Sequence, residues 1–275
     1  MIFDRVVVAD WSASSRPARG RDSIWVAVAE GESDVIATTN PSTRAEATAH
    51  LGDVCRRPGS TLLGVDFSLG YPAGTANLLG LDGVPWQETW KLLAELVDDA
   101  DNNGNNRFEV AAELNRRMGG GPGPFWGCPA SGRGPTLTST KVTSAPLGEW
   151  RQVEQRLRDK GHRPFSAWQL LGAGSVGSQT LLGIPRLVEL TASLTGRGRR
   201  VAVWPFDARI VVGGGVDLVI AEVWPSLHPS EEPAAEQVRD EVQVIETSRR
   251  LRGGVELTPS GSSDVLAEEG WILGA

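Results

Sequence analysis

The sequence predicts an α/β fold in which a mixed β-sheet is flanked by helices. Short apolar runs at residues 6–9, 62–65 and 218–221 are the first observation. Unbroken runs of this kind are typical of strands that are buried on both faces. The second observation is that longer segments between these runs carry apolar residues at helical spacing. Together, the two patterns favour a sheet with helices packed against it.

The first part of the chain predicts an antiparallel meander, followed by a helix and a fourth strand. The meander strands are expected at 5–10, 22–29 and 34–38. The short connections between them favour antiparallel pairing. Ser42 or Thr43 could cap the helix, and Pro58 with Gly59 would stop it. The fourth strand then ends at Asp66.

The rest of the chain predicts several helices and the later strands. Helices are expected within 72–101, 107–118, 150–160, 181–194 and 233–252, and strands at 200–206 and 217–224. Residues 119–135 are rich in glycine and proline, which favours either a mobile lid or a packed functional loop. We therefore expect a single domain, residues 1–275, with a five-stranded core sheet. A large helical and Gly/Pro-rich insertion, at about 72–199, would separate the fourth and fifth core strands.

The composition is that of an ordinary globular protein, with 40% hydrophobic and 22% charged residues. A formal net charge of −7 argues against a protein held on nucleic acid by bulk electrostatics, although a local basic patch would suffice for transient contact. No apolar run is long enough for a membrane helix, and residues 1–4 lack the pattern of a signal peptide. Cys55 and Cys128 cannot form a disulfide framework and show no metal-binding spacing. We expect a cytoplasmic protein with no membrane partner.

Carboxylates at strand ends are the strongest functional pattern. Asp10, Asp66 and Glu222 each follow an apolar run, and Asp240 is expected about two turns into the last long helix. Two carboxylates 4 Å apart repel by about 4 kcal/mol at an effective dielectric of 20, so a cluster persists only if it binds cations or keeps some members protonated. Mg²⁺ and Mn²⁺ prefer such oxygen ligands. Each acid could instead merely cap a neighbouring turn, but the repetition favours a shared site.

Seven segments spread over nearly the whole chain carry a more specific pattern. They are VVVADWSA at 6–13, LLGVDFSLGYP at 62–72, NNRFEVAAELN at 105–115, PFWG at 124–127, AEVWPSL at 221–227, RDEVQV at 239–244 and EEGWILG at 268–274. These segments resemble an uncharacterised family of predicted RNase H-like nucleases. The resemblance implies an RNase H-like sheet order and an activity on phosphodiester bonds, although a fold by itself does not fix a function.

The resemblance also implies roles for the four acids. Asp10 and Asp66 would hold two ions, Mg²⁺ or Mn²⁺, and Asp240 would complete the metal site from the helix. Glu222 would be a further ligand or would orient the attacking water. Two such ions can stabilise both the attacking and the leaving oxygen of a phosphoryl displacement. The expected substrate is a nucleic acid or a nucleotide.

Two further groups are candidates for substrate binding. Phe125 and Trp126, in the Gly/Pro-rich loop, could stack on a base, or they could plug the insertion as core residues. Arg197, Arg199 and Arg200 could contact a phosphate backbone, although basic residues at a helix end are usually solvated.

Two alternative functions stay open at this point. Sugar kinases and actin-like ATPases share this strand order, and here the turn at 12–15 and the glycine turn at 172–177 could hold the phosphates of a Mg-nucleotide. The glycines of the second turn could instead serve close helix packing. The other alternative is a non-enzymatic protein that binds a nucleotide or cofactor through the PFWG loop.

Overall fold

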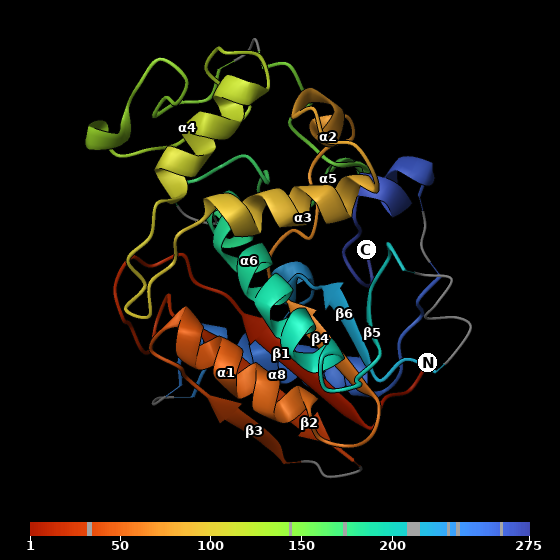
Figure 1. Cartoon of the computed structure of the whole chain (residues 1–275). Coiled ribbons are helices and arrows are strands. Elements are labelled where there is room, and N and C mark those ends of the chain that lie inside the picture. The colour runs from red at the N-terminus through yellow and green to blue at the C-terminus, as the bar shows by residue number, and fades with distance from the viewer. Residues whose placement is uncertain are drawn as a thin grey trace.

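A computed structural model gives the arrangement of the chain (Figure 1). It describes residues 1–31, 35–142, 145–172, 175–207, 215–229, 232–234, 237–258 and 261–275. The fold is α/β, with a mixed sheet flanked by helices, as the sequence predicts. Within the described ranges, no helix is both long enough and apolar enough to cross a membrane.

The described residues form one sheet of six strands. They are β1 (Arg5–Asp10), β2 (Trp25–Glu30), β3 (Ile36–Thr39), β4 (Thr61–Val65), β5 (Val201–Val203) and β6 (Leu218–Glu222). Their order across the sheet is β3-β2-β1-β4-β6-β5. The first three strands are antiparallel neighbours, whereas β1, β4, β6 and β5 run parallel. The sheet therefore has six strands, not the five expected for the core, and the strand expected at 200–206 is present as the short β5, which pairs with β6.

Seven α-helices surround the sheet in the described part of the chain. They are α1 (Arg44–Cys55), α2 (Thr75–Leu78), α3 (Pro85–Leu96), α4 (Arg107–Arg117), α5 (Gln152–Asp159), α6 (Val176–Thr195) and α8 (Arg239–Arg252). Short helical turns lie at Ala130–Gly132, Pro225–Leu227 and Val265–Glu269. Thr43 caps α1 as expected, because its hydroxyl accepts a hydrogen bond from the Glu46 N–H. The expected start of α8 at residue 233 is wrong, so Asp240 lies in the first turn of that helix.

Two hydrophobic cores lie on the two faces of the sheet. Helix α8 packs on β1 and β2 from one side, while α1 and α6 cover the other side (Figure 1). Side chains of β1 alternate between these cores, because successive residues of a strand point to opposite faces. Val7 and Ala9 belong to the core beneath α1 and α6, and Val6 and Val8 to the core beneath α8.

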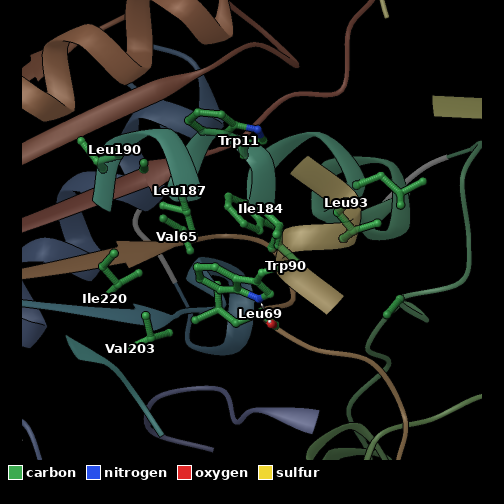
Figure 2. Close-up of a cluster of buried hydrophobic side chains, with 14 of the residues drawn as sticks. Trp11, Val65, Leu69, Trp90, Leu93, Ile184, Leu187, Leu190, Val203 and Ile220 are labelled. Atoms are coloured by element: carbon green, nitrogen blue, oxygen red, sulfur yellow. Dashed lines mark hydrogen bonds between the residues drawn. The ribbon is translucent and has the colours of Figure 1, made fainter. Parts of the chain in front are cut away.

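The insertion packs onto the first of these cores through α3 and α6. Figure 2 shows Ile184, Leu187 and Leu190 of α6 in the same cluster as Val65 of β4. In the same view, the Trp90 indole of α3 donates a hydrogen bond of 2.8 Å to the Leu69 carbonyl. The chain that leaves β4 is thus held against the first long helix of the insertion.

Two buried glutamates near residue 270 also hold the insertion. Glu268 accepts hydrogen bonds from the backbone N–H groups of Gly74 and Ala76, at 2.8 and 2.5 Å. Glu269 accepts from the N–H groups of Ala73 and Gln152, at 3.0 and 2.7 Å. These N–H groups lie at the starts of α2 and α5, where helices leave backbone donors unsatisfied. The acids of the EEGWILG segment therefore have a structural role.

Helix α6 approaches the sheet closely at Gly183. A Cβ atom on Gly183 would lie 2.4 Å from the ring of Phe67, which is itself buried beside Trp11. This separation is far below van der Waals contact, and neighbours in a packed core have little room to move. Gly183 therefore sets how closely α6 lies on the strand ends.

We expect Gly183→Ala to lower the free energy of unfolding by about 1–3 kcal/mol, the usual cost of overpacking a core. The steric cost should exceed the gain in helix propensity, which is about 1 kcal/mol. Urea denaturation would measure the change. Gly148→Ala is the control, because a Cβ there meets no atom within 4 Å. Equal stability of the Gly183 variant and the wild type would show that this contact does not limit the packing of α6.

Candidate functional site

Two of the four predicted acids meet at the carboxyl edge of the central strands. Asp10 is the last residue of β1, and Asp66 directly follows β4, the parallel neighbour of β1. The Asp66 N–H donates a hydrogen bond of 3.0 Å to the Ala9 carbonyl, which continues the ladder by one residue. The alternation along both strands puts these two side chains on the face that α8 covers.

Helix α8 brings Asp240 to the same edge. Asp240 lies in the first turn of the helix, where the positive end of the helix dipole favours a carboxylate. Its Oδ2 accepts a hydrogen bond of 2.7 Å from the Asp22 N–H. Asp22 precedes β2 and adds a fourth carboxylate that the sequence reasoning missed. The hairpin register, with Asp10 opposite Trp25, could have revealed it.

The electrostatics of this edge are unfavourable to ionised acids. Burial raises the pKa of Asp10 well above its usual value, and the charges of Asp66, Asp240 and Asp22 raise it further. Burial, then Glu222 and Asp240, raise the pKa of Asp66 to about 7. Burial is also the main reason why the pKa of Asp240 is raised. Among the described residues, no arginine or lysine lowers the pKa of Asp10 or Asp66.

The acids line two adjoining cavities. Asp10, Asp22 and Asp240 line a cleft of about 560 Å³, which we call the acid cleft. Asp66 lines a neighbouring pocket of about 170 Å³. Gln179 of α6 borders both cavities, and its amide donates a hydrogen bond to the Trp11 carbonyl. The two cavities therefore meet at the first turn of α6.

Carboxylate oxygens are the donor type that Mg²⁺ and Mn²⁺ prefer, so the chemistry of this cluster fits these ions. The side chains are not placed to bind one ion together. Within the described ranges, no group of three or more His, Cys, Asp or Glu side chains is placed to hold a metal. Asp10, Asp66 and Asp240 thus have raised pKa values and form no ion pair among the described residues, so they are able to take up cations or protons.

Of the strand-end acids that we expected to meet, Glu222 reaches only Asp66, with which it shares the smaller pocket and whose pKa its charge helps to raise. It pairs in register with Val65, and its side chain lies on the opposite face of the sheet from Asp10 and Asp66. Both of its oxygens are bound by Arg151, at 2.8 and 2.6 Å, and Oε2 also accepts the Leu69 N–H at 3.2 Å. Glu154 binds the same guanidinium. Glu222 therefore belongs to a buried ion-pair network.

The aromatic candidates divide into a core residue and a half-buried one. Phe125 is buried and packs edge-on against Tyr71 and Trp168, so its ring faces no cavity where a base could stack. Trp126 is half-buried and lines a pocket of about 280 Å³ beside Trp168 and Lys141. This pocket shares no lining residue with the acid cleft among the residues described.

The three candidate arginines lie at the other edge of the sheet. Arg200 directly precedes β5, whose first residue pairs with the first residue of β6. Its guanidinium bonds Asp217 at 3.1 Å, and Arg199 bonds the carbonyls of Gly59 and Asp217. Arg197 is exposed just before them. Because β4, β5 and β6 are parallel, these residues mark the amino edge, and the structure does not bring them to the acids.

The glycine turn at 172–177 is described only in part, because residues 173–174 lie outside the described residues. At Gly177, a Cβ atom would lie 2.5 Å from the Ala167 carbonyl and 2.7 Å from that of Gln169. This close approach agrees with the packing interpretation of the turn.

Comparisons of the chain with family models, with curated proteins and with solved structures give no match.

The raised pKa values predict how stability depends on pH. A carboxyl whose pKa is raised by folding stabilises the folded state below its unfolded pKa, and this contribution is lost as the pH rises through the folded pKa. For Asp66 the window runs from about pH 4 to about pH 7. At pH 8 we expect Asp66→Asn to be more stable than the wild type, with a free energy of unfolding about 1–3 kcal/mol higher.

Urea denaturation at pH 8 and pH 3.5 would measure this effect, and the difference should vanish at the lower pH. Asp82→Asn, at an exposed aspartate, is the control and should match the wild type at both values. A wild type that is as stable as Asp66→Asn at pH 8 would contradict the electrostatic description of the site.

Replacing Glu222 should lower the stability of the protein, whereas replacing Asp66 should raise it. Glu222→Gln leaves the buried Arg151 with Glu154 alone, and breaking a buried pair typically costs about 3–5 kcal/mol. We expect a clear loss of stability in thermal or urea unfolding at pH 7. Glu113→Gln breaks a surface pair with Arg116 and should cost less than about 1 kcal/mol. Similar small losses in both variants would argue against a structural role for Glu222.

Proposed function

We propose that this protein is a metal-dependent phosphodiester hydrolase of the RNase H-like type. The observation that carries the proposal is a set of carboxyl groups with raised pKa values, drawn from two central parallel strands and the start of α8, which form no ion pair among the described residues and lie beside an open cleft. Clustered acids at strand ends are expensive unless they bind something. The meander followed by the parallel strands β4 and β6 agrees with the resemblance in the seven sequence segments.

Asp10, Asp66 and Asp240 would hold Mg²⁺ or Mn²⁺. When bound, such ions lower the pKa of a coordinated water and stabilise charge on a phosphoryl oxygen. The residues of the chain supply the fixed ligands from β1, β4 and α8, and the Asp22 N–H orients Asp240. Asp10 and Asp66 are half-buried and line the two adjoining cavities. We assign Glu222 a positioning role, since Arg151 binds both of its oxygens.

A Mg-nucleotide phosphotransferase or ATPase is the second candidate. The observation that favours it is that Ser12, Ala13 and Ser14 line the acid cleft beside Asp10. A loop of small residues next to a metal-binding acid suits the phosphates of a nucleotide. The third alternative, a non-enzymatic protein that binds ligands through the PFWG loop, is weakened by the burial of Phe125.

The first test is a manganese titration of thermal stability at pH 7.5. A ligand that binds only the folded state adds about 2.7 kcal/mol at 100 times its dissociation constant. We expect manganese to raise the Tm of the wild type and of Asp82→Asn, but not that of Asp66→Asn. An equal shift in all three proteins would place the metal elsewhere and overturn the assignment of these ligands.

The second test is turnover of phosphodiester substrates with manganese present. Asp10→Asn, Asp66→Asn and Asp240→Asn should each abolish hydrolysis of single-stranded and duplex oligonucleotides while retaining a cooperative unfolding transition. Wild-type rates of oligonucleotide hydrolysis in Asp66→Asn would contradict the mechanism. Calorimetric titration with Mg-ATP separates the second candidate, because saturable binding of ATP without oligonucleotide hydrolysis would favour a phosphotransferase.

A further inference from the structure

The acid cleft also contains a buried arginine that forms no ion pair among the described residues. Arg107, the first residue of α4, is only 9% exposed and lines the acid cleft together with Asp10 and Asp240. Its Nε donates to the Ser178 hydroxyl at 3.0 Å, and its Nη1 donates to the Ser15 hydroxyl at 2.9 Å and the Asn105 amide oxygen at 2.8 Å. All three acceptors are neutral. Among the residues described, Arg107 forms no ion pair, and its Nη2 makes no hydrogen bond.

The neighbouring arginines show that this lack of a counter-charge is particular to Arg107. Arg44 and Arg186 both bind Asp99, at 2.6 and 3.0 Å. Burial and the charge of Arg44 lower the pKa of Arg107 to about 10, against a smaller opposing effect of Glu109, so Arg107 is still charged at neutral pH. A buried charge is costly unless it is paired. The cost is recovered when an anion binds the free edge of the guanidinium.

The surroundings of Arg107 suit an anion with several oxygens. Ser175 and Gln179, at the start of α6, line the same cleft, and the Ser175 side chain makes no capping hydrogen bond. The positive end of the dipole of this long helix favours a negative group. Trp11 also lines this cleft, and its indole N–H is buried and has no acceptor among the described residues. The residues that line the cleft thus include donors that no acceptor among the described residues uses.

We propose that Arg107 forms the centre of a phosphate-binding subsite in the acid cleft, which holds a phosphate group of the substrate close to the carboxylates. This inference rests on the proposed function, since it names a second point of contact for a phosphodiester substrate. Hydrogen bonds from arginine to phosphate are charge-assisted and strong, and the two N–H groups of the free Nη2 remain to donate them, because Nε and Nη1 already donate to neutral acceptors. The NNRFEVAAELN segment contains Arg107, which sequence reasoning left without a role.

The test uses calorimetric titration at pH 7.5 with EDTA present, so that it does not depend on a metal. The probes are inorganic phosphate and a trinucleotide that has internal phosphodiesters but no terminal phosphate. We expect the wild type to bind at least one probe, and Arg107→Gln to bind it about tenfold more weakly or worse. Arg116→Gln, an exposed arginine on the same helix, is the matched control and should bind like the wild type.

Each outcome is decisive. Binding of phosphate alone assigns the subsite to a terminal phosphate group, whereas binding of the trinucleotide assigns it to the backbone of a strand. The proposal is overturned if the wild type binds neither probe when the probe is in 50-fold excess over protein, at about 10 mM. Equal affinity of the wild type and Arg107→Gln for a probe would also overturn it. Because EDTA removes metals, the phosphate titration and the manganese titration are independent. A negative result in either one does not change the interpretation of the other.

A second measurement covers the case in which Arg107→Gln does not fold. Hydrogen exchange on the wild-type protein, with and without 20-fold excess probe at roughly millimolar concentration, should show protection in residues 105–110 and 175–180. Arg107→Lys keeps the charge and should retain part of the affinity. Protection confined to other segments would overturn the proposal.

Discussion

The parallel pairing of β1 with β4 fixes the position of the two central acids. Ala9 lies opposite Val65, so Asp10 and Asp66 follow at the same edge and on the same face. A shift of one residue in either strand would turn its acid to the other face, because side chains alternate with a period of two. The buried side chains on both faces of these strands prevent such a shift. The hydrophobic core thus enforces a contact that electrostatics opposes.

The distribution of buried arginines separates the acids of this protein into two kinds. Asp99 is bound by Arg44 and Arg186, and Glu222 by Arg151, so these carboxylates are neutralised within the fold. Asp10 and Asp66 lie nearby and have no such partner among the described residues. The chain therefore has the means to neutralise buried acids and does so elsewhere. This contrast supports the proposal that Asp10 and Asp66 bind a ligand.

The sequence alone could predict the elements and part of the site. The apolar runs predict the strands, and Thr43 predicts the start of α1, because both signals are local. The closeness of Asp10 and Asp66 could also be predicted, because each residue lies at the carboxyl end of an apolar run. Glu222 could not be assigned a face, because a strand buried on both sides has no polar alternation to reveal it. The position of Arg200 at the amino edge, by contrast, could have been inferred, since it precedes its strand.

Contacts between segments far apart in the chain could not be predicted from the sequence. Arg151 meets Glu222, and Arg107 meets Ser178, only because the insertion folds back over the sheet, and no local pattern encodes that path. The start of α8 was misplaced because Pro233 is a common first residue of helices, while the helix begins at Arg239. This error matters for the site, since it moves Asp240 from the body of the helix to its positively polarised end.

The hydrogen bonds of Glu268 and Glu269 have a consequence for the order of assembly. These two side chains hold the starts of α2 and α5, yet they follow both helices late in the chain. On a ribosome, where the chain emerges from its amino end, the insertion must wait for residues that are translated long after it. The central strand β6 is late as well, and its pairing with β4 closes a long loop. Such non-local contacts slow folding, so completion of the acid cleft is expected to be a late step of folding.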